Sequence, residues 1–287
     1  IEGAASDFVC NIEGAAITLV YVDATQGWIT TDTGNSTDAF INNFVEATVS
    51  GSCNSLVTCG NFKIAVFKGP GTFEVTSAGT PSGSTSVDYL VVGGGGGTSS
   101  GPSNPGWGGG GGAGGYRESP GSTTCYTASP LGASPATAIT VSKQSYPITV
   151  GAGGAGSAPK GTSGGNSSAL GIQAAGGGGG GGYTEAGING GSGGGGGGCG
   201  SSGTGGSGNT PPVSPAQGSD GGNGKPTGNE SGGGGGGASS SGADGGAGPG
   251  SSAGNGGNGT NTGILGSSPL APSIGAPGPA PGRFFGG

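Results

Sequence analysis

The sequence contains no histidine, few charged residues and few apolar ones. Histidine is the commonest general base and the commonest metal ligand, so its absence argues against conventional catalysis and against a metal centre. Only 7% of the 287 residues are charged and 29% are hydrophobic, whereas about 25% and about 45–50% are usual, which excludes an ordinary side-chain core spanning the whole chain. We therefore expect no enzyme activity, no cofactor and no metal.

Basic residues and long apolar runs are scarce too. The chain has 7 Lys and Arg residues against 14 Asp and Glu residues, a net charge of −7, so nucleic acid is not an expected partner. No apolar run reaches about 18 residues and no basic-then-apolar segment opens the chain, so we predict neither a membrane-spanning helix nor a signal peptide. Because the chain starts at Ile1 and ends inside a glycine stretch, we expect it to be part of a longer polypeptide.

The 5 cysteines are odd in number and show no paired CxxC spacing, which argues against a zinc site. Cys53 and Cys59 are close enough in sequence to close a short loop, and their oxidation state stays open. The others are Cys10, Cys125 and Cys199.

Glycine dominates the composition, with 82 residues, and 19 prolines accompany it. A strict Gly-X-Y register is absent, which excludes collagen. A flexible linker is one interpretation, because glycine is costly to order. However, Ser, Thr, Asn, Pro and aromatic residues collect between pure glycine runs, and a linker needs no such segregation. The uninterrupted runs are residues 93–97, 108–112, 176–182, 193–198 and 232–237.

Pure glycine permits a second interpretation, in which extended helices with three residues per turn pack side by side and bond laterally through their main chains. A six-residue run with a rise of about 3.1 Å per residue would span about 19 Å, and the segments between runs would form turns at either end. We favour this packed polyglycine-II arrangement, which would present varied connectors on a rigid scaffold.

Three β-hairpins are predicted from runs rich in β-branched and aromatic residues. They join residues 16–22 to 28–31, residues 62–67 to 72–76, and residues 138–141 to 146–150. A further strand at residues 87–92 leads into the first glycine run.

These patterns predict an all-β N-terminal module followed by a sandwich of polyglycine-II helices, with almost no α-helix. We divide the chain into three parts. A module for attachment or oligomerisation occupies residues 1–60, a hairpin and lead-in strand occupy residues 61–92, and a glycine-rich domain with polar connecting loops and a hairpin near residues 138–150 occupies residues 93–287.

Three motifs follow one another in a distinctive order: Gly71-Thr72-Phe73, then Tyr89-Leu90-Val91-Val92 running into glycine, then Tyr146-Pro147-Ile148-Thr149-Val150-Gly151-Ala152-Gly153-Gly154. In this order they resemble the glycine-rich domain of bacteriophage tail-fibre and related virion proteins, over residues 60–260. A looser resemblance is to the fibre-tip adhesins of T-even-like phages, in which polyglycine helices form a packed sandwich and distal loops bind the bacterial surface.

The resemblance implies a structural and adhesive subunit of a phage virion, a tail fibre or similar appendage, on the surface of an extracellular particle. The implied partners are other virion proteins, further copies of the chain with a trimer favoured, and a bacterial surface glycan or outer-membrane protein. Two alternatives stay open: a purely architectural virion protein, such as a capsid decoration or fibre shaft, and an ice-binding or extracellular-matrix protein.

Receptor-binding candidates are the aromatic residues between glycine runs and the polar residues of the connector at residues 199–231, the favoured specificity loop. Aromatic faces stack on sugar rings or fill apolar pockets at low entropic cost, although these rings could instead cover the ends of the glycine layer. Asp220 and Asn223 are interpreted as turn formers rather than calcium ligands. The candidates are Trp107, Tyr116, Tyr183, Pro211, Pro212, Asp220, Lys225 and Glu230.

Overall fold

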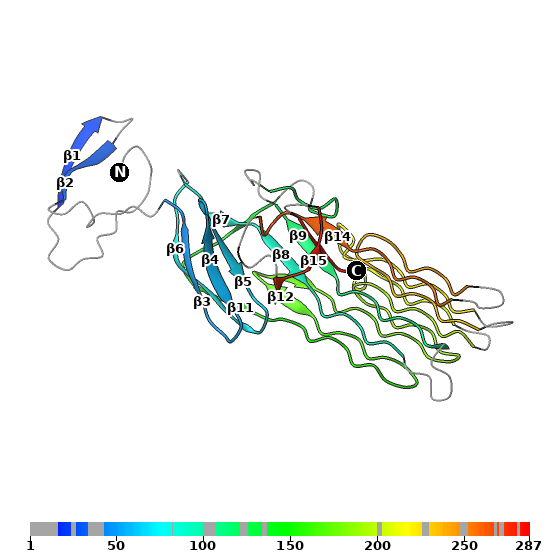
Figure 1. Cartoon of the computed structure of the whole chain (residues 1–287). Helices are drawn as coiled ribbons and strands as arrows, with labels where there is room; N and C mark the ends of the chain where they lie inside the picture. The colour runs from blue at the N-terminus through cyan, green and yellow to red at the C-terminus, as the bar shows by residue number, and fades with distance from the viewer. Residues whose placement is uncertain are drawn as a thin grey trace. The chain divides into compact units, whose positions relative to one another are not determined.

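The computed structural model describes residues 17–23, 27–33, 43–81, 83–99, 107–120, 126–133, 137–199, 203–225, 230–246, 252–266, 269, 273–279 and 282–287. Regular secondary structure in these residues consists of short β-strands with almost no helix, which confirms the predicted all-β class. The strands are β1 (Ile17–Asp23), β2 (Gly27–Thr33), β3 (Val45–Val49), β4 (Ser55–Cys59), β5 (Phe62–Val66), β6 (Gly71–Ala78), β7 (Ser86–Val87), β8 (Tyr89–Val92), β9 (Tyr116–Ser119), β10 (Ile139–Thr140), β11 (Ser145–Ile148), β12 (Ser167–Ala169), β13 (Ile172–Ala174), β14 (Thr260–Thr262), β15 (Ala276–Pro277) and β16 (Arg283–Phe285) (Figure 1).

The chain divides into two compact units whose sequence segments alternate. The smaller unit contains Ile1–Thr48, Glu74–Val87 and Thr140–Ser145, and the larger contains Val49–Phe73, Asp88–Ile139 and Tyr146–Gly287. The predicted boundaries after residues 60 and 92 do not coincide with this division. The larger unit contains the glycine-rich segments and all candidate residues.

The first predicted hairpin is confirmed. Strands β1 and β2 pair antiparallel, with Tyr21 opposite Trp28. These two rings meet edge to face, with centroids 5.5 Å apart and planes at 61°. Cross-strand aromatic pairs of this kind stabilise a two-stranded sheet.

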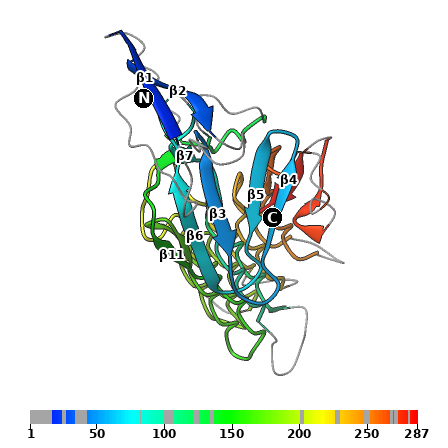
Figure 2. The same ribbon diagram turned by 90° about the vertical axis from the view of Figure 1, so that its left-hand side faces the viewer.

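The other two predicted hairpins are wrong. Strand β5 pairs with β4 through a tight turn in which Gly60 has a φ of 59°, a left-handed value that suits glycine. Strand β6 lies instead between β3 and β11 (Figure 2). Strand β10 pairs with β7. The Asn54 side chain accepts hydrogen bonds from the N–H groups of Lys68 and Gly69 and so fixes the connection from β5 to β6. Periodicity within a strand does not reveal its partner, because sheets join strands that are distant in sequence.

Apolar side chains are buried in small groups rather than in one large core. Phe73 and Val75 are buried on the same face of β6, as the period of two predicts, and Glu74 between them is exposed. In the larger unit, Val91 on β8 and Tyr116 on β9 are buried where the first glycine segments meet the strands. Side-chain packing is therefore concentrated at the β-strands.

Extended segments, here called rods, fill the glycine-rich part of the larger unit. In Figure 1 they run side by side, away from β8, β9, β12 and β14. Within the described residues the rods are 93–99, 107–115, 151–157, 160–166, 175–182, 185–191, 192–199, 203–209, 217–225, 231–238, 240–246 and 252–259.

Main-chain hydrogen bonds repeat every three residues along a rod. In the 192–199 rod, the N–H groups of Gly193 and Gly196 both donate to one neighbouring rod. The N–H groups one residue further along donate to a second rod, and those two residues further along donate to a third. A period of three residues defines the extended polyglycine-II helix, so this part of the prediction is confirmed.

The 192–199 rod is hydrogen-bonded on all sides. Some of its neighbours accept from its N–H groups and the others donate to its carbonyl groups. Both parallel and antiparallel neighbours occur, because the spacing of three residues permits bonding in either direction. Its six neighbours are the rods 107–115, 175–182, 185–191, 203–209, 217–225 and 231–238.

Only glycine fits in the interior of this lattice. A β-carbon built on Gly193, Gly195 or Gly196 would lie 1.8, 2.0 or 1.9 Å from a carbonyl oxygen of a neighbouring rod. A β-carbon on Gly153, in the outer 151–157 rod, would lie 3.8 Å from its nearest neighbour. The absence of side chains is therefore a packing requirement inside the lattice and not at its surface.

The rods reverse direction, so their connections fall at two ends. The end where rods join β8, β9, β12 and β13 is here called the strand end. The opposite end carries Trp107 and Tyr183 and is called the aromatic end.

Candidate functional site

Trp107 and Tyr183 come together at the aromatic end because of how their rods pair. Trp107 opens the 107–115 rod, and Tyr183 directly follows the 175–182 rod. These rods are antiparallel neighbours, with the Gly109 N–H donating to the Gly181 carbonyl at 2.7 Å. The two rings have centroids 5.5 Å apart and planes inclined at 52°. The lattice thus builds one aromatic surface from residues that are far apart in sequence.

The end of the 192–199 rod holds the main chain of both aromatic residues. The Gly198 N–H donates to the Trp107 carbonyl at 2.8 Å, and the Cys199 N–H donates to the Tyr183 carbonyl at 2.9 Å. Tyr183 has a φ of 46°, a conformation that is uncommon for a residue with a side chain, and 46% of its surface is exposed. Residues held in uncommon backbone conformations cluster at functional sites, which makes Tyr183 a candidate.

Charged and polar groups surround the pair. The Lys160 Nζ and Glu185 Oε2 atoms lie 3.0 Å apart in an ion pair. A hydrogen bond with the Cys199 thiol raises the pKa of the Tyr183 hydroxyl, and the nearby Glu230 carboxylate acts in the same direction. Both interactions stabilise the protonated hydroxyl, and its oxygen lone pairs can accept a hydrogen bond from a ligand. The aromatic end can offer a ligand two ring faces, a phenol and charges of both signs.

Tyr116 is not a surface residue, and its selection as a receptor-binding candidate is wrong. Only 1% of its surface is exposed, and its hydroxyl donates to Glu118 Oε2 at 2.8 Å. Burial raises the pKa of this hydroxyl, and the Glu118 carboxylate raises it further. Tyr116 is the first residue of strand β9, at the strand end, so it packs beneath the strands and does not belong to a connector.

The connector at residues 199–231 is not one specificity loop. It contains the complete 203–209 and 217–225 rods, so its parts lie at different ends. Pro211 and Pro212 are at the strand end, where the Gln217 Nε2 donates to the Pro211 carbonyl at 2.8 Å. Lys225 and Glu230 are at the aromatic end, and eight residues at a rise of about 3.1 Å separate the two groups by about 25 Å.

Asp220 lies within a rod and not in a turn, which corrects the interpretation of the Asp220 to Asn223 segment. The Asp220 carboxylate accepts from the Gly208 N–H at 2.7 Å, and the Asn223 side chain accepts from the Gly205 N–H at 3.0 Å. Both pairs follow the three-residue period. These side chains supply acceptors that a further glycine rod would otherwise provide, and the Asp220 residue is exposed.

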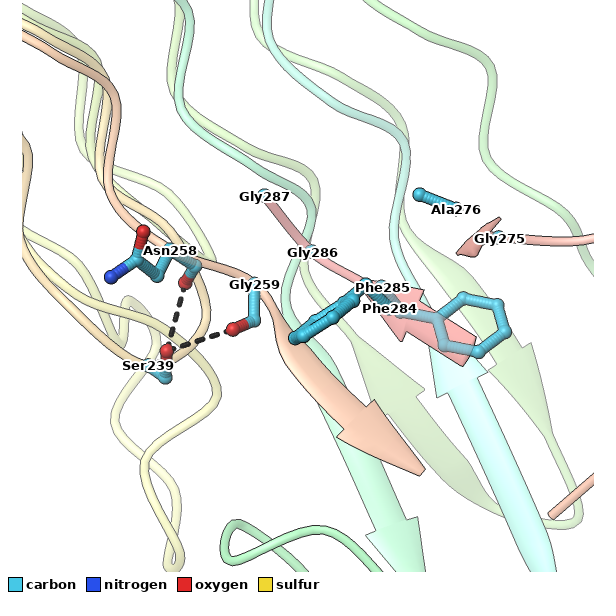
Figure 3. A pocket seen from close by; sticks show the side chains of 9 residues that line it. All are labelled: Ser239, Asn258, Gly259, Gly275, Ala276, Phe284, Phe285, Gly286 and Gly287. Atoms are coloured by element: carbon cyan, nitrogen blue, oxygen red, sulfur yellow. Dashed lines mark hydrogen bonds between the residues drawn. The ribbon is translucent and has the colours of Figure 1, made fainter. Parts of the chain in front are cut away.

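Of the eight candidates, the structure therefore brings four to one end. Trp107, Tyr183, Lys225 and Glu230 lie at the aromatic end, whereas Pro211 and Pro212 lie at the strand end, Asp220 on a rod and Tyr116 in the interior. A groove beside Phe284 and Phe285 is a second surface feature (Figure 3), and its one sequence signal is a pair of adjacent aromatic residues late in a glycine-rich chain.

Within the described part of the chain, no group of three or more His, Cys, Asp or Glu side chains could hold a metal ion. The same residues include no helix of the length and apolarity needed to cross a membrane. Cys53, Cys59 and Cys199 are not disulfide-bonded, so the short loop that Cys53 and Cys59 could close is not cross-linked. Cys10 and Cys125 lie outside the described residues.

The short strands and the rods define an all-β protein whose larger unit is ordered by main-chain bonding between glycines. A family model described as a glycine-rich domain matches residues 69–287, and the chain belongs to this family. No curated protein and no solved structure matches the chain. The family description specifies neither a virion nor a host.

Proposed function

We propose that this protein is a structural and adhesive subunit of a phage virion, a tail fibre or similar appendage, which binds the bacterial host through the aromatic end. The observation that carries the proposal is the convergence of Trp107 and Tyr183 at one end of a rigid rod lattice. The resemblance of the motifs at residues 71–73, 89–92 and 146–154 to phage glycine-rich domains supports the virion assignment.

The rods and their ends differ in the groups that they can offer to a ligand. The rods use main-chain N–H and C=O groups for internal bonding, so their interior offers a ligand nothing. The aromatic end offers exposed ring surface held in place by main-chain hydrogen bonds. A preorganised aromatic surface binds with a small loss of conformational entropy, and several copies on one particle would add avidity.

The proposed ligand is a glycan or an outer-membrane protein of the bacterial surface. Ring faces stack on the C–H faces of sugars, and the Tyr183 hydroxyl, Lys160 and Glu185 can donate to or accept from polar groups at the rim. Other virion proteins and further copies of the chain are the proposed structural partners, and the proposed location is the particle surface.

The test is adsorption of particles that carry variants of this chain. Tyr183→Asn removes the ring but suits the left-handed backbone, because asparagine tolerates positive φ. We expect this variant, combined with Trp107→Ala, to reduce the adsorption rate about tenfold or more. Tyr183→Phe keeps the ring and should retain most of the adsorption.

Phe62→Ala is the matched control, since Phe62 is 49% exposed on β5 and lies outside the aromatic end. It should leave adsorption unchanged. Equal adsorption of the double variant and the control, at equal incorporation into particles, would contradict the receptor-binding role.

A purely architectural virion protein is the second candidate. It is favoured by the exposed aromatic pair of β1 and β2, where Tyr21 and Trp28 are 52% and 50% exposed. An isolated two-stranded hairpin is marginal in water, so exposed rings on it favour contact with another subunit. If Trp28→Ser abolished assembly while the aromatic-end variants kept normal adsorption, the architectural role would be preferred.

A further inference from the structure

Two neighbouring rods at the lattice surface keep unused main-chain groups. The 93–99 and 151–157 rods are joined by a hydrogen bond from the Gly154 N–H to the Gly95 carbonyl at 2.8 Å. We propose that their outer side, here called the bare face, packs against the bare face of a second copy of this chain. The inference rests on the part of the proposed function that makes further copies of the chain its partners. The bare face consists of four exposed residues, Gly95, Thr98, Gly153 and Gly156.

The N–H groups of the bare face follow the three-residue period of the lattice. Its two residues in each rod are one period apart, so their N–H groups point in the same direction. None of these four N–H groups donates to another residue that the structure describes. Among the same residues, the carbonyls of Gly153 and Gly156 accept no hydrogen bond. Because Gly153 and Gly156 each carry an unused donor and an unused acceptor, the face is complementary to a copy of itself.

Packing within one copy does not require glycine on the bare face. A β-carbon would lie 3.8 Å from its nearest neighbour at Gly95 or Gly153 and 3.4 Å from it at Gly156, against 2.0 Å at Gly195 in the interior. Glycine is costly to order, so a single copy gains nothing from exposed glycine at these positions. The exposed glycines do allow the main chain of another copy to approach as closely as rods approach one another.

Elsewhere on the lattice surface, side chains close the rods. Along the 203–209 rod, the side chains of Asn189, Asp220 and Asn223 accept hydrogen bonds from three main-chain N–H groups, at 2.8, 2.7 and 3.0 Å. A side chain in such a position occupies the place of a further rod. The bare face has no Asn or Asp, and its largest side chain is that of Thr98. It therefore leaves that place open to a rod of another copy.

The bare face is also uncharged, although the chain has a net charge of −7. Two copies with this net charge repel each other, so they can associate only where the contact itself holds no carboxylate. The exposed carboxylates of Asp220 and Asp244 lie on other rods. A charged or a large apolar partner would find neither a charge nor a broad side-chain surface here, which favours a second glycine lattice. Because the face spans only two rods, we expect weak association, with a Kd of about 100 µM.

The test is sedimentation equilibrium of the full chain at concentrations up to about 1 mM, where we expect a monomer–dimer equilibrium. Gly153→Lys places like charges of both copies in the contact and should raise the dimer Kd about tenfold or more. Gly153→Pro removes an unused N–H group but suits the extended rod, and it should raise the Kd about threefold or more. Neither variant should lower the urea midpoint, because the Gly153 N–H has no bond to a described residue and its β-carbon would meet nothing closer than 3.8 Å.

Ser163→Lys is the matched control, since Ser163 is exposed on the neighbouring 160–166 rod and lies outside the bare face. It changes the net charge by the same amount as Gly153→Lys and should leave the Kd unchanged. Tyr183→Asn should also leave the Kd unchanged, so a failure of this inference appears in sedimentation and a failure of the receptor-binding role appears in adsorption. Absence of a dimer up to about 1 mM, or an equal Kd for Gly153→Lys and Ser163→Lys, would overturn the proposal.

Discussion

Strand β6 and the 192–199 rod show two different ways to order a chain within one protein. On β6, Phe73 and Val75 are buried, and their side chains fill space between main chains. In the rod, Gly193 and its neighbours leave no space to fill, because a β-carbon would meet a carbonyl oxygen at 1.8 Å. The first region is stabilised by side-chain burial and the second by main-chain hydrogen bonds in three directions.

The contrast teaches that glycine content alone does not measure order. Glycine loses more conformational freedom on folding than any other residue, so a lone rod would be disfavoured. The 192–199 rod has six neighbours, which satisfy its N–H and carbonyl groups along its length. A glycine chain becomes ordered when enough copies of it lie side by side.

The comparison predicts that adding one methyl group to the lattice has the largest effect. Gly195→Ala would place a β-carbon 2.0 Å from the Gly233 carbonyl oxygen, and the hydrogen bonds between the rods hinder either main chain from moving away. We expect a loss of about 3 kcal/mol or more in the free energy of unfolding, measured by urea denaturation.

Gly153→Ala is the matched control, since its β-carbon would meet nothing closer than 3.8 Å. It should be close to neutral. Equal stability of the two variants would show that the central rod is not packed as described.

In the strand region, removing side-chain atoms should reduce the free energy of unfolding. Val75→Ala removes atoms from a side chain that is fully buried on β6 and should cost about 2 kcal/mol through lost burial and the cavity left behind. Glu74→Ala changes the exposed face of the same strand and is the control. Both variants are compared by thermal unfolding. A neutral result for Val75→Ala would mean that side-chain packing does not stabilise this region.

The smallest of the three effects concerns Tyr116, where the 107–115 rod passes into β9. Tyr116→Phe removes a hydrogen-bond donor from the buried Glu118 carboxylate and should cost about 1.5 kcal/mol at neutral pH. The Thr262 hydroxyl and the Ser129 N–H still donate to Glu118, which limits the loss.

The pH dependence follows from the raised pKa of Tyr116. In the unfolded chain this hydroxyl ionises near pH ~10, whereas burial and Glu118 keep it protonated in the folded protein. Its contribution is complete below pH ~10 and is lost as the pH rises further, because only the unfolded state then releases the proton. Urea midpoints should therefore fall above pH ~10 less steeply in Tyr116→Phe than in Tyr89→Phe, and parallel curves would refute this.

Much of the fold could be predicted from the sequence because glycine segregates from other residues. The pure runs at residues 93–97 and 193–198 indicated rods, and the β-branched run at residues 17–22 indicated a strand with its hairpin partner. What local pattern did not reveal was pairing: β6 joins β3 and β11, although its nearest neighbour in sequence is β5.

The position of Trp107 and Tyr183 between glycine runs predicts that they lie at the ends of rods, and the antiparallel rods bring their rings together. Their role in binding a receptor stays a prediction. The sequence does not reveal the two rods within residues 199–231, because they include Ser, Thr, Asn and Asp and so lack the pure glycine signature. Those polar residues mark rods at the edge of the lattice, where a side chain replaces a missing neighbour.

The three-residue hydrogen-bond period also restricts how such a protein can change length. Deleting one residue from the 192–199 rod would rotate every later donor by about 120° and aim it at the wrong neighbour. Deleting or inserting three residues would restore the direction of each donor and only shorten or extend the block. Insertions and deletions tolerated within rods should therefore come in multiples of three residues, whereas the length of the connectors is not restricted in this way.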